Sequence, residues 1–172
     1  MMRDDEPHTP TGISRKALTQ QMIQMKCKTD KIEALDKINF WGNELEDVSI
    51  IRGMPNLQII SLSVNKIWSL EDFAFCPRLK ELYLRKNDVR DLNEIQFLRN
   101  CPNLETLWLE ENPICYIPNY WQQILNILPN LIKLDSVDVT MDERDGAPSI
   151  APTHYSPPKQ SYMHDPSPKQ QF

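Results

Sequence analysis

The chain has 172 residues, of which 40% are hydrophobic and 25% are charged, with a formal net charge of −5 and a pI near 5.2. This length suits a single domain with a sizeable core, and the acidic balance argues against a nucleic-acid-binding surface built on a broad basic field. The amino end, MMRDDEPHTPTG, lacks the apolar stretch of a signal peptide, and no run of about 18 apolar residues occurs, so the sequence predicts a soluble, intracellular protein without membrane insertion.

The first elements are predicted at the amino end. Residues 1–13 are expected to be disordered, and residues 14–34 to form a helical cap. Ser14 can cap a helix whose apolar side chains recur on one face at i, i+4 and i+7, namely Leu18, Met22 and Met25. A second short turn is predicted at Asp30, where Glu33 completes a capping box.

Residues 35–145 contain an internal repeat. Four segments follow the pattern L-x-x-(L/I)-x-(L/F)-x-x-N: LDKINFWGNEL, LQIISLSVNKI, LKELYLRKNDV and LETLWLEENPI. This pattern is the signature of leucine-rich repeats. The sequence therefore predicts an α/β solenoid, a short leucine-rich-repeat arc with parallel strands on its concave face and a cap at each end.

Stacking of the repeats explains why apolar residues recur at the same positions in each repeat. A single repeat cannot bury its leucines, whereas stacked repeats place equivalent side chains in continuous columns. Three such columns are expected: Leu35/Leu57/Leu79/Leu104, Ile38/Ile60/Leu82/Leu107 and Phe40/Leu62/Leu84/Leu109.

An asparagine follows each predicted strand, where the backbone bends out of the arc. A side-chain amide at this point can bond backbone groups that the bend leaves unpaired. We therefore interpret the four asparagines as a structural ladder: Asn43, Asn65, Asn87 and Asn112.

The carboxyl-terminal cap is expected within the same range, up to residue 145. Pro118 and Asn119 introduce a predicted helix with one apolar face formed by Trp121, Ile124, Leu125 and Leu128. A last strand is predicted around residues 131–135. The apolar residues that follow, Val137, Val139 and Met141, are expected to close the stack.

Residues 146–172 are predicted to be a disordered, proline-rich tail. Six of the fourteen prolines fall between residues 148 and 172, and aliphatic residues are few. Ser156 and Ser167 each precede a proline and are candidate phosphorylation sites for proline-directed kinases.

The concave face is the candidate partner-binding surface. Alternate strand residues point into the open arc, and they include large aromatic side chains. Burial of these rings would favour folding, so their exposure is better explained by a partner. Tryptophan, tyrosine and arginine are the residues that protein interfaces use most. The candidate binding residues are Trp41, Ile59, Tyr83, Arg85, Trp108 and Glu110. Partial coverage of these rings by neighbouring side chains or by the tail is the alternative. Trp68 and Trp121 are assigned to packing instead.

Side chains typical of catalytic or metal sites are sparse. The four cysteines form no CxxC pair, and Cys76 and Cys101 fall in a buried column with Met54 and Leu128, so we expect no disulfide. All three histidines lie in the flanks, at His8, His154 and His164. With four glycines and no glycine-rich phosphate loop, the chain is predicted not to be an enzyme and to have no catalytic, cofactor or metal site.

Several segments resemble a known family. NFWGNELEDVSI, ISLSVNKIWSLE, ELYLRKN and LWLEENPICYIP resemble the cilia- and flagella-associated protein 410 family across about residues 14–141, and LPNLIKLD is shared with the wider SDS-twenty-two-like class of leucine-rich repeats. The resemblance implies a protein of the cytoplasm, cytoskeleton and cilium basal body that supports cilium formation and associates with a NIMA-related kinase or another ciliary protein. Members carry a further helical oligomerisation segment, whereas this chain ends in PSPKQQF without apolar heptads, which leaves the oligomeric state open.

Two functions follow from these features. The first is a protein-binding scaffold acting as a ciliary adaptor. The second is a nuclear ribonucleoprotein or chromatin scaffold, because similar short repeats occur in the spliceosomal U-two A-prime protein and in acidic nuclear phosphoproteins. Residues 146–172 have a formal charge of +1 and form no acidic arm, which argues against the second function.

Overall fold

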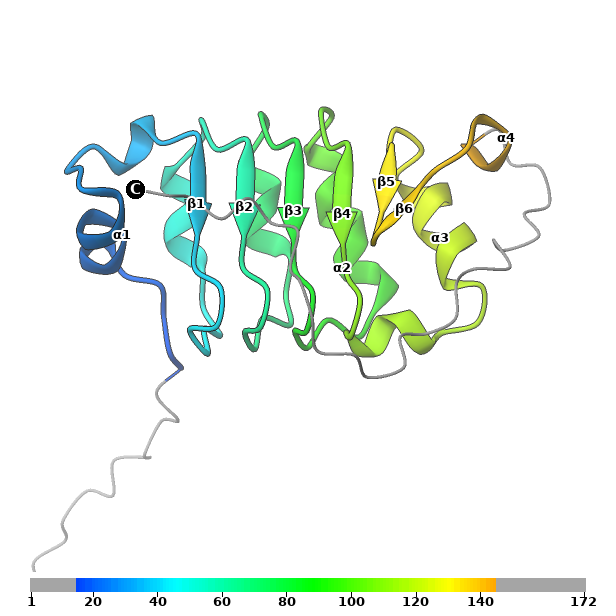
Figure 1. Ribbon diagram of the computed structural model, residues 1–172, viewed down its shortest axis with the longest axis horizontal. Helices are drawn as coiled ribbons and strands as arrows, with labels where there is room; N and C mark the ends of the chain where they lie inside the picture. The colour runs from blue at the N-terminus through cyan, green and yellow to red at the C-terminus, as the bar shows by residue number, and fades with distance from the viewer. Residues whose placement is uncertain (1–14, 145–172) are drawn as a thin grey trace, which may run out of the picture.

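The computed structural model describes residues 15–144, which form one curved stack of repeats (Figure 1). The segment predicted to be disordered at the amino end, Ser14, the proline-rich tail and its two candidate phosphorylation sites, Ser156 and Ser167, lie outside the described residues.

One six-stranded sheet runs through the stack in the order of the sequence. Its strands are β1 (Lys37–Asn39), β2 (Ile59–Ser61), β3 (Glu81–Tyr83), β4 (Thr106–Trp108), β5 (Lys133–Leu134) and β6 (Val137–Asp138). The first five strands are parallel, and β6 turns back antiparallel to β5. The register aligns Ile38, Ile60, Leu82, Leu107 and Leu134 in one row, which confirms the predicted solenoid.

Helical segments cover the opposite side of the sheet and both of its ends. They are α1 (Gln20–Cys27), η1 (Ile32–Ala34), η2 (Ser49–Gly53), η3 (Glu71–Phe75), α2 (Leu92–Gln96), η4 (Phe97–Asn100), η5 (Pro113–Tyr116), α3 (Tyr120–Ile127) and α4 (Met141–Arg144), where η denotes a 3₁₀-helix. The linkers from β1 to β2 and from β2 to β3 hold only the 3₁₀-helices η2 and η3, while the linkers from β3 to β4 and from β4 to β5 accommodate α2 and α3. Figure 1 shows these helices behind the strands, so the strands line the open, concave face.

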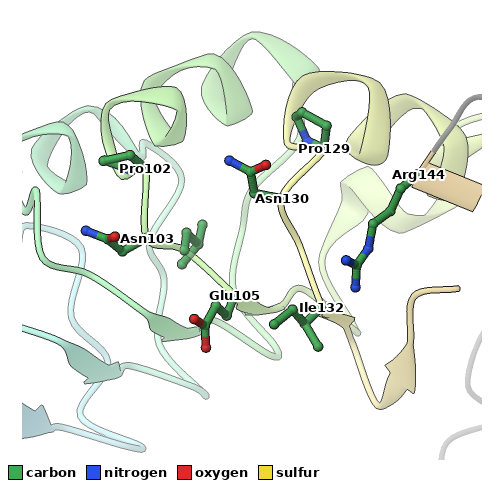
Figure 2. Close-up of a pocket in the computed structure, with 8 residues that line it drawn as sticks. Pro102, Asn103, Glu105, Pro129, Asn130, Ile132 and Arg144 are labelled. Atoms are coloured by element: carbon green, nitrogen blue, oxygen red, sulfur yellow. The ribbon is translucent and has the colours of Figure 1, made fainter. Parts of the chain in front are cut away.

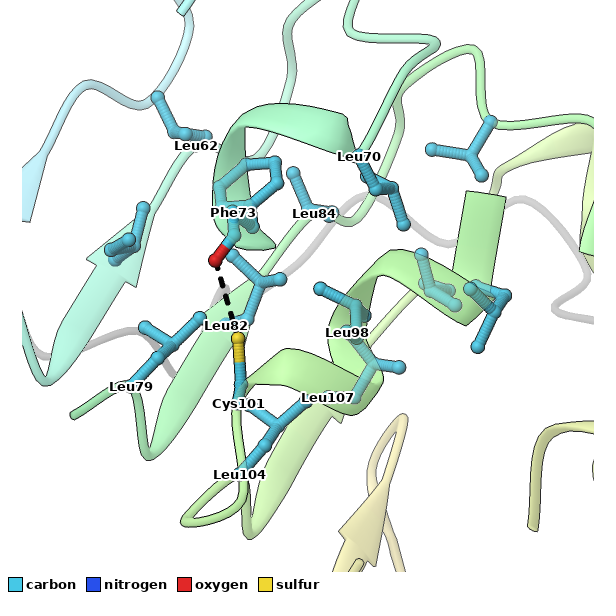
Figure 3. Close-up of a cluster of buried hydrophobic side chains, with 14 of the residues drawn as sticks. Leu62, Leu70, Phe73, Leu79, Leu82, Leu84, Leu98, Cys101, Leu104 and Leu107 are labelled. Atoms are coloured by element: carbon cyan, nitrogen blue, oxygen red, sulfur yellow. Dashed lines mark hydrogen bonds between the residues drawn. The ribbon is translucent and has the colours of Figure 1, made fainter. Parts of the chain in front are cut away.

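The core lies between the strands and the helices. Leu57, Leu79, Leu82 and Leu107 are fully buried, and Figure 3 shows how side chains of consecutive repeats pack against one another. Leu35, at the N-terminal end of the predicted column, is only partly buried because no full repeat precedes it. Burial of leucine-sized side chains contributes roughly 1.5–3 kcal/mol each, so the stack is stabilised mainly by these columns.

The N-terminal helix begins later than predicted. Residues before it are extended: the Leu18 amide donates to the Asp47 carbonyl at 2.8 Å, and the Glu46 amide donates to the Lys16 carbonyl at 2.8 Å. Thr19 then caps α1 by accepting a hydrogen bond from the Met22 amide. The prediction of one face with Leu18, Met22 and Met25 was wrong, since Ile23 faces the core and Met25 is 73% exposed.

The predicted capping box at Asp30 was also wrong. The 3₁₀-helix η1 begins at Ile32, its N-cap is Lys31, and no side chain caps it. Instead, the Lys31 amide donates to the Thr29 hydroxyl at 3.2 Å. The chain therefore turns into β1 without the Glu33 contact.

The carboxyl-terminal end closes the stack with α3, β5 and β6. Trp121, Ile124 and Leu125 on α3 and Leu128 directly after it are buried, as predicted. Met141, however, is 76% exposed and begins a short helix, α4, so its expected part in the closure was wrong. Thr140 and Glu143 form a capping box there, in which each side chain bonds the other residue's backbone amide.

Cys76 and Cys101 are free, buried thiols within the predicted column. The Cys101 thiol donates to the Phe73 carbonyl at 3.2 Å (Figure 3). Desolvation raises the pKa of Cys76 to about 12 and that of Cys101 to about 11, which keeps both thiols protonated.

Candidate partner-binding surface

The register of the sheet determines which side chains line the concave face. Asn39, Ser61, Tyr83 and Trp108 form one row across β1 to β4, and Lys37, Ile59, Glu81 and Thr106 form another. Backbone bonds continue the same register beyond the strands, where Gly42 pairs with Ser63 and Val64 with Arg85. By alternation, Trp41, Ser63, Arg85 and Glu110 therefore form a third row on this face.

Tyr83 and Trp108 are buried, so the prediction that both rings are exposed was wrong. Their exposed fractions are 9% and 4%. The two rings meet edge to face, with centroids 6.2 Å apart and an interplanar angle of 69°. The Arg85 guanidinium lies over the Trp108 ring at 5.9 Å and covers it further. These rings therefore contribute to the stability of the face, in the manner expected of T-shaped pairs and cation–π contacts.

The polar atoms of these rings bond to carboxylates of their own strands. The Tyr83 hydroxyl donates to Glu81 at 2.7 Å, and the Trp108 indole N–H donates to Glu110 at 2.7 Å. Glu110 also accepts a hydrogen bond from the Ser136 hydroxyl at 3.2 Å.

Arg85 completes this cluster by pairing with two acidic residues. Its guanidinium lies 4.0 Å from the Glu110 carboxylate and donates to the Glu111 carboxylate. The arginine side chain is 15% exposed, so these pairs are more shielded from water than an ordinary surface salt bridge. We call the set of Glu81, Tyr83, Arg85, Trp108, Glu110 and Glu111 the aromatic plateau.

Trp41 is the candidate residue that presents most apolar surface. It is 52% exposed, while Ile59 in the next strand is partly buried. The Trp41 backbone is fixed: its amide donates to the Asn39 side chain at 3.1 Å, and its carbonyl accepts from the Asn43 side chain at 2.9 Å. The following Gly42 adopts a φ of 68°, a left-handed conformation that suits glycine.

Three of the four predicted ladder asparagines are buried and bond across repeats. The Asn87 side chain accepts from the Ile67 amide at 2.9 Å and donates to the carbonyls of Leu62 and Leu84. Asn65 and Asn112 repeat this arrangement one repeat earlier and one repeat later. Asn43 differs, because its side chain is half-buried and donates only to the nearby Trp41 carbonyl.

Asp135 bonds the preceding repeat from the end of β5, a role that the sequence did not indicate. Its carboxylate accepts a 2.7 Å hydrogen bond from the Leu109 amide, in the place that the Trp108 carbonyl takes for the Leu84 amide one repeat earlier. The pKa of Asp135 is raised to about 7, chiefly because burial disfavours the charged form; the nearby Glu110 also raises it, while hydrogen bonds from Leu109 and Tyr120 lower it. The available signal was an acidic residue directly after Leu134, at the position that holds Tyr83 and Trp108 in the earlier repeats.

A shallow groove lies between the last repeat and the carboxyl-terminal cap (Figure 2). Its lining is Pro102, Asn103, Leu104, Glu105, Pro129, Asn130, Ile132 and Arg144. It contains no histidine, cysteine or serine, so it offers no pair of nucleophile and base. The part of the chain that the structure describes also holds no group of three or more potential metal ligands and no helix that could span a membrane.

The two tryptophans assigned to packing behave differently. Trp121 is buried, as expected. Trp68 is 47% exposed and lies outside the concave rows, with the Arg15 guanidinium 5.6 Å from its ring centroid. Its assignment to packing was therefore only partly right, because nearly half of the residue's surface is exposed.

Comparisons with known proteins agree with this architecture. A family model described as leucine-rich repeat matches residues 19–155. Cilia- and flagella-associated protein 410 from mouse is 44% identical over 128 residues, which are 73% of this chain and 51% of the mouse protein. The human protein of the same name is 39% identical over 73% of this chain and 50% of its own length. The chain thus spans about half the length of these relatives.

A solved structure shows the same fold. The crystal structure of the Drosophila melanogaster SNF/U2A' complex contains a chain with a TM-score of 0.62 and 25% identity, and the match covers 69% of each chain. The repeats, the parallel sheet and the match over residues 19–155 lead to one conclusion: this chain belongs to the leucine-rich-repeat family and is a protein-interaction scaffold similar to cilia- and flagella-associated protein 410.

Proposed function

We propose that the chain is a non-enzymatic adaptor at the cilium basal body and cytoskeleton, where it supports cilium assembly by binding another protein. The observation that carries this proposal is the similarity to cilia- and flagella-associated protein 410 over 73% of the chain. Because the chain spans about half of those relatives, the role of the whole protein is part of the proposal. The partner is a NIMA-related kinase or another ciliary protein, and neither nucleic acid nor a membrane is required.

The concave face is the proposed contact surface. It offers a half-exposed tryptophan, Trp41, in one row and the partly buried Ile59 two rows away, on a rigid sheet. Binding surfaces on rigid elements lose little conformational entropy when a partner docks. In this proposal the aromatic plateau, which includes Tyr83, Arg85, Trp108 and Glu110, provides a fixed, polar rim instead of exposed anchors.

A nuclear scaffold is the second candidate function. It is favoured by the likeness to a chain in the SNF/U2A' complex, in which an arc of the same fold is assembled with another protein. The identity of 25% is lower than the 39–44% found with the ciliary relatives, so we rank this function second.

Fluorescent tagging in ciliated cells separates the two functions. The adaptor proposal predicts a signal at the base of the cilium and shorter or fewer cilia after depletion of the protein. Re-expression of the intact chain restores cilia, whereas the nuclear function predicts a nuclear signal and normal cilia. A purely nuclear signal would contradict the ciliary proposal.

A further inference from the structure

The N-terminal end of the stack differs in charge from the rest of the described chain. Residues 15–41 contain six basic residues and three acidic ones, Asp30, Glu33 and Asp36, which give a formal charge of +3. Residues 42–144 contain ten basic and sixteen acidic residues, a formal charge of −6. The stretch 15–28, which includes α1, has no acidic residue at all.

The structure places this basic end beside β1, the strand that leads into the exposed Trp41. Figure 1 shows α1 next to β1. The Lys26 ammonium lies 5.0 Å from the ring centroid of Phe40, the residue before Trp41, and Lys28 ends α1. Both lysines and Lys37 at the start of β1 are exposed. Within residues 15–144, none of the three forms an ion pair.

The segment beside Trp41 in the next repeat has small side chains. Ser63 is next to Trp41 in its row, and Ser61 is next to Asn39 in the adjoining row. Both serines are buried, so the half-exposed Trp41 has no large neighbour in its own row on this side.

We infer that Trp41, Lys26, Lys28 and Lys37 form a docking corner for an acidic protein segment that carries an apolar or aromatic side chain. The inference rests on the proposed function and specifies the chemistry of its partner. The indole supplies apolar contact area, and the lysines attract carboxylates that the net negative charge of residues 42–144 repels. Repulsion from residues 42–144 also disfavours a broad anionic lipid surface, whereas a narrow segment meets only the corner.

The inference is tested with a display library of short random peptides selected on the full chain. The expected pool is enriched in Asp and Glu around at least one Leu, Phe, Tyr or Trp, and its members bind less tightly as NaCl is raised. Trp41→Ala and the double variant Lys26→Glu/Lys28→Glu each weaken binding of the selected peptides by about tenfold or more. A circular-dichroism melt shows that the variants stay folded.

Two matched variants control for general effects. Trp68→Ala removes a similarly exposed tryptophan outside the concave face, and Arg78→Glu/Lys80→Glu reverses two exposed charges outside the corner; both are expected to bind like the original chain. A pool without acidic enrichment, an empty selection, or equal losses in Trp41→Ala and Trp68→Ala would overturn the inference. Phosphatidylserine vesicles that pull down the chain, but not Lys26→Glu/Lys28→Glu, would replace the peptide partner with a membrane.

Failure of this inference is distinguishable from failure of the proposed function. If Trp41→Ala still reaches the cilium base and restores cilia in depleted cells, the adaptor proposal stands and the docking corner is wrong. If the intact chain is absent from the cilium base, the adaptor proposal fails regardless of the peptide selection.

Discussion

The indole N–H of Trp108 donates a 2.7 Å hydrogen bond to the carboxylate of Glu110, two residues further along the chain on the same face. This bond, together with the Arg85 guanidinium above the ring, means that Trp108 is 4% exposed although it lies on the open side of the sheet. The aromatic plateau is therefore part of the folded structure before any partner binds.

Replacing Trp108 with alanine is expected to destabilise the protein. Truncation of a buried tryptophan costs about 3–5 kcal/mol, because the contacts with Tyr83 and Arg85 are lost and a cavity remains. Trp41→Ala is the matched control, and it should change the free energy of unfolding by less than about 1 kcal/mol because Trp41 is half-exposed. Urea denaturation measures both values, and similar losses in the two variants would contradict this account.

The asparagine ladder predicts unequal effects at equivalent sequence positions. Asn87→Ala leaves the Ile67 amide and two carbonyls without partners and should lower the free energy of unfolding by about 2–4 kcal/mol. Asn43→Ala removes one bond at a half-buried site and should cost less than about 1 kcal/mol. Thermal and urea unfolding that rank the two variants equally would refute the ladder as a stabilising element.

The strand register could be predicted from the sequence because it follows from spacing alone. The repeated leucines and asparagines specify which residues share a row, and the rows of Asn39 and Lys37 follow from alternation. The exposure of Tyr83 and Trp108 could not be predicted, because it depends on how neighbouring rings and Arg85 orient above the sheet.

Other errors arose where several residues can serve the same local role. Ser14 and Thr19 can both cap a helix, and only the backbone pairing of Leu18 with Asp47 decides in favour of Thr19. Asp135 was missed because it lies in the row of Tyr83 and Trp108, away from the asparagine positions, and its carboxylate takes the place of a strand carbonyl. The charge of the docking corner was readable from the sequence, but the position of α1 next to β1 required the structure.

Asp135 should make stability depend on pH. Its pKa is about 7 in the folded protein and close to 3.8 in an unfolded chain, so between these values the folded state binds the extra proton. The free energy of unfolding should therefore fall as the pH rises from about 4 to about 7. In Asp135→Asn, which keeps the acceptor for the Leu109 amide, this dependence disappears, and the variant should be more stable than the original chain at pH 8.

Urea denaturation of both proteins at pH 5 and pH 8 provides the measurement. The two proteins share every other titrating group, so the difference between their free energies of unfolding reports the titration of Asp135. A difference that stays constant between the two pH values would show that Asp135 does not titrate in this range.

The cysteines should react unequally with a thiol reagent. Cys76, Cys101 and Cys115 are buried, and desolvation raises the pKa of the first two far above neutrality. Cys27 is partly exposed, although burial raises its pKa as well. Native protein at pH 7.5 should therefore be alkylated slowly and mainly at Cys27, while urea exposes all four thiols. Mass spectrometry of peptides gives the sites, and fast native labelling of Cys76 would contradict the packed column.

Site-specific photo-crosslinking in ciliated cells tests the central claim most directly. A photoreactive amino acid replaces Ile59 on the concave face or, as a control, the exposed Arg78 outside it. The account predicts a protein adduct from position 59 in fractions containing the cilium base and none from position 78. Adducts from position 78 alone, or from neither position, would contradict a partner-binding concave face.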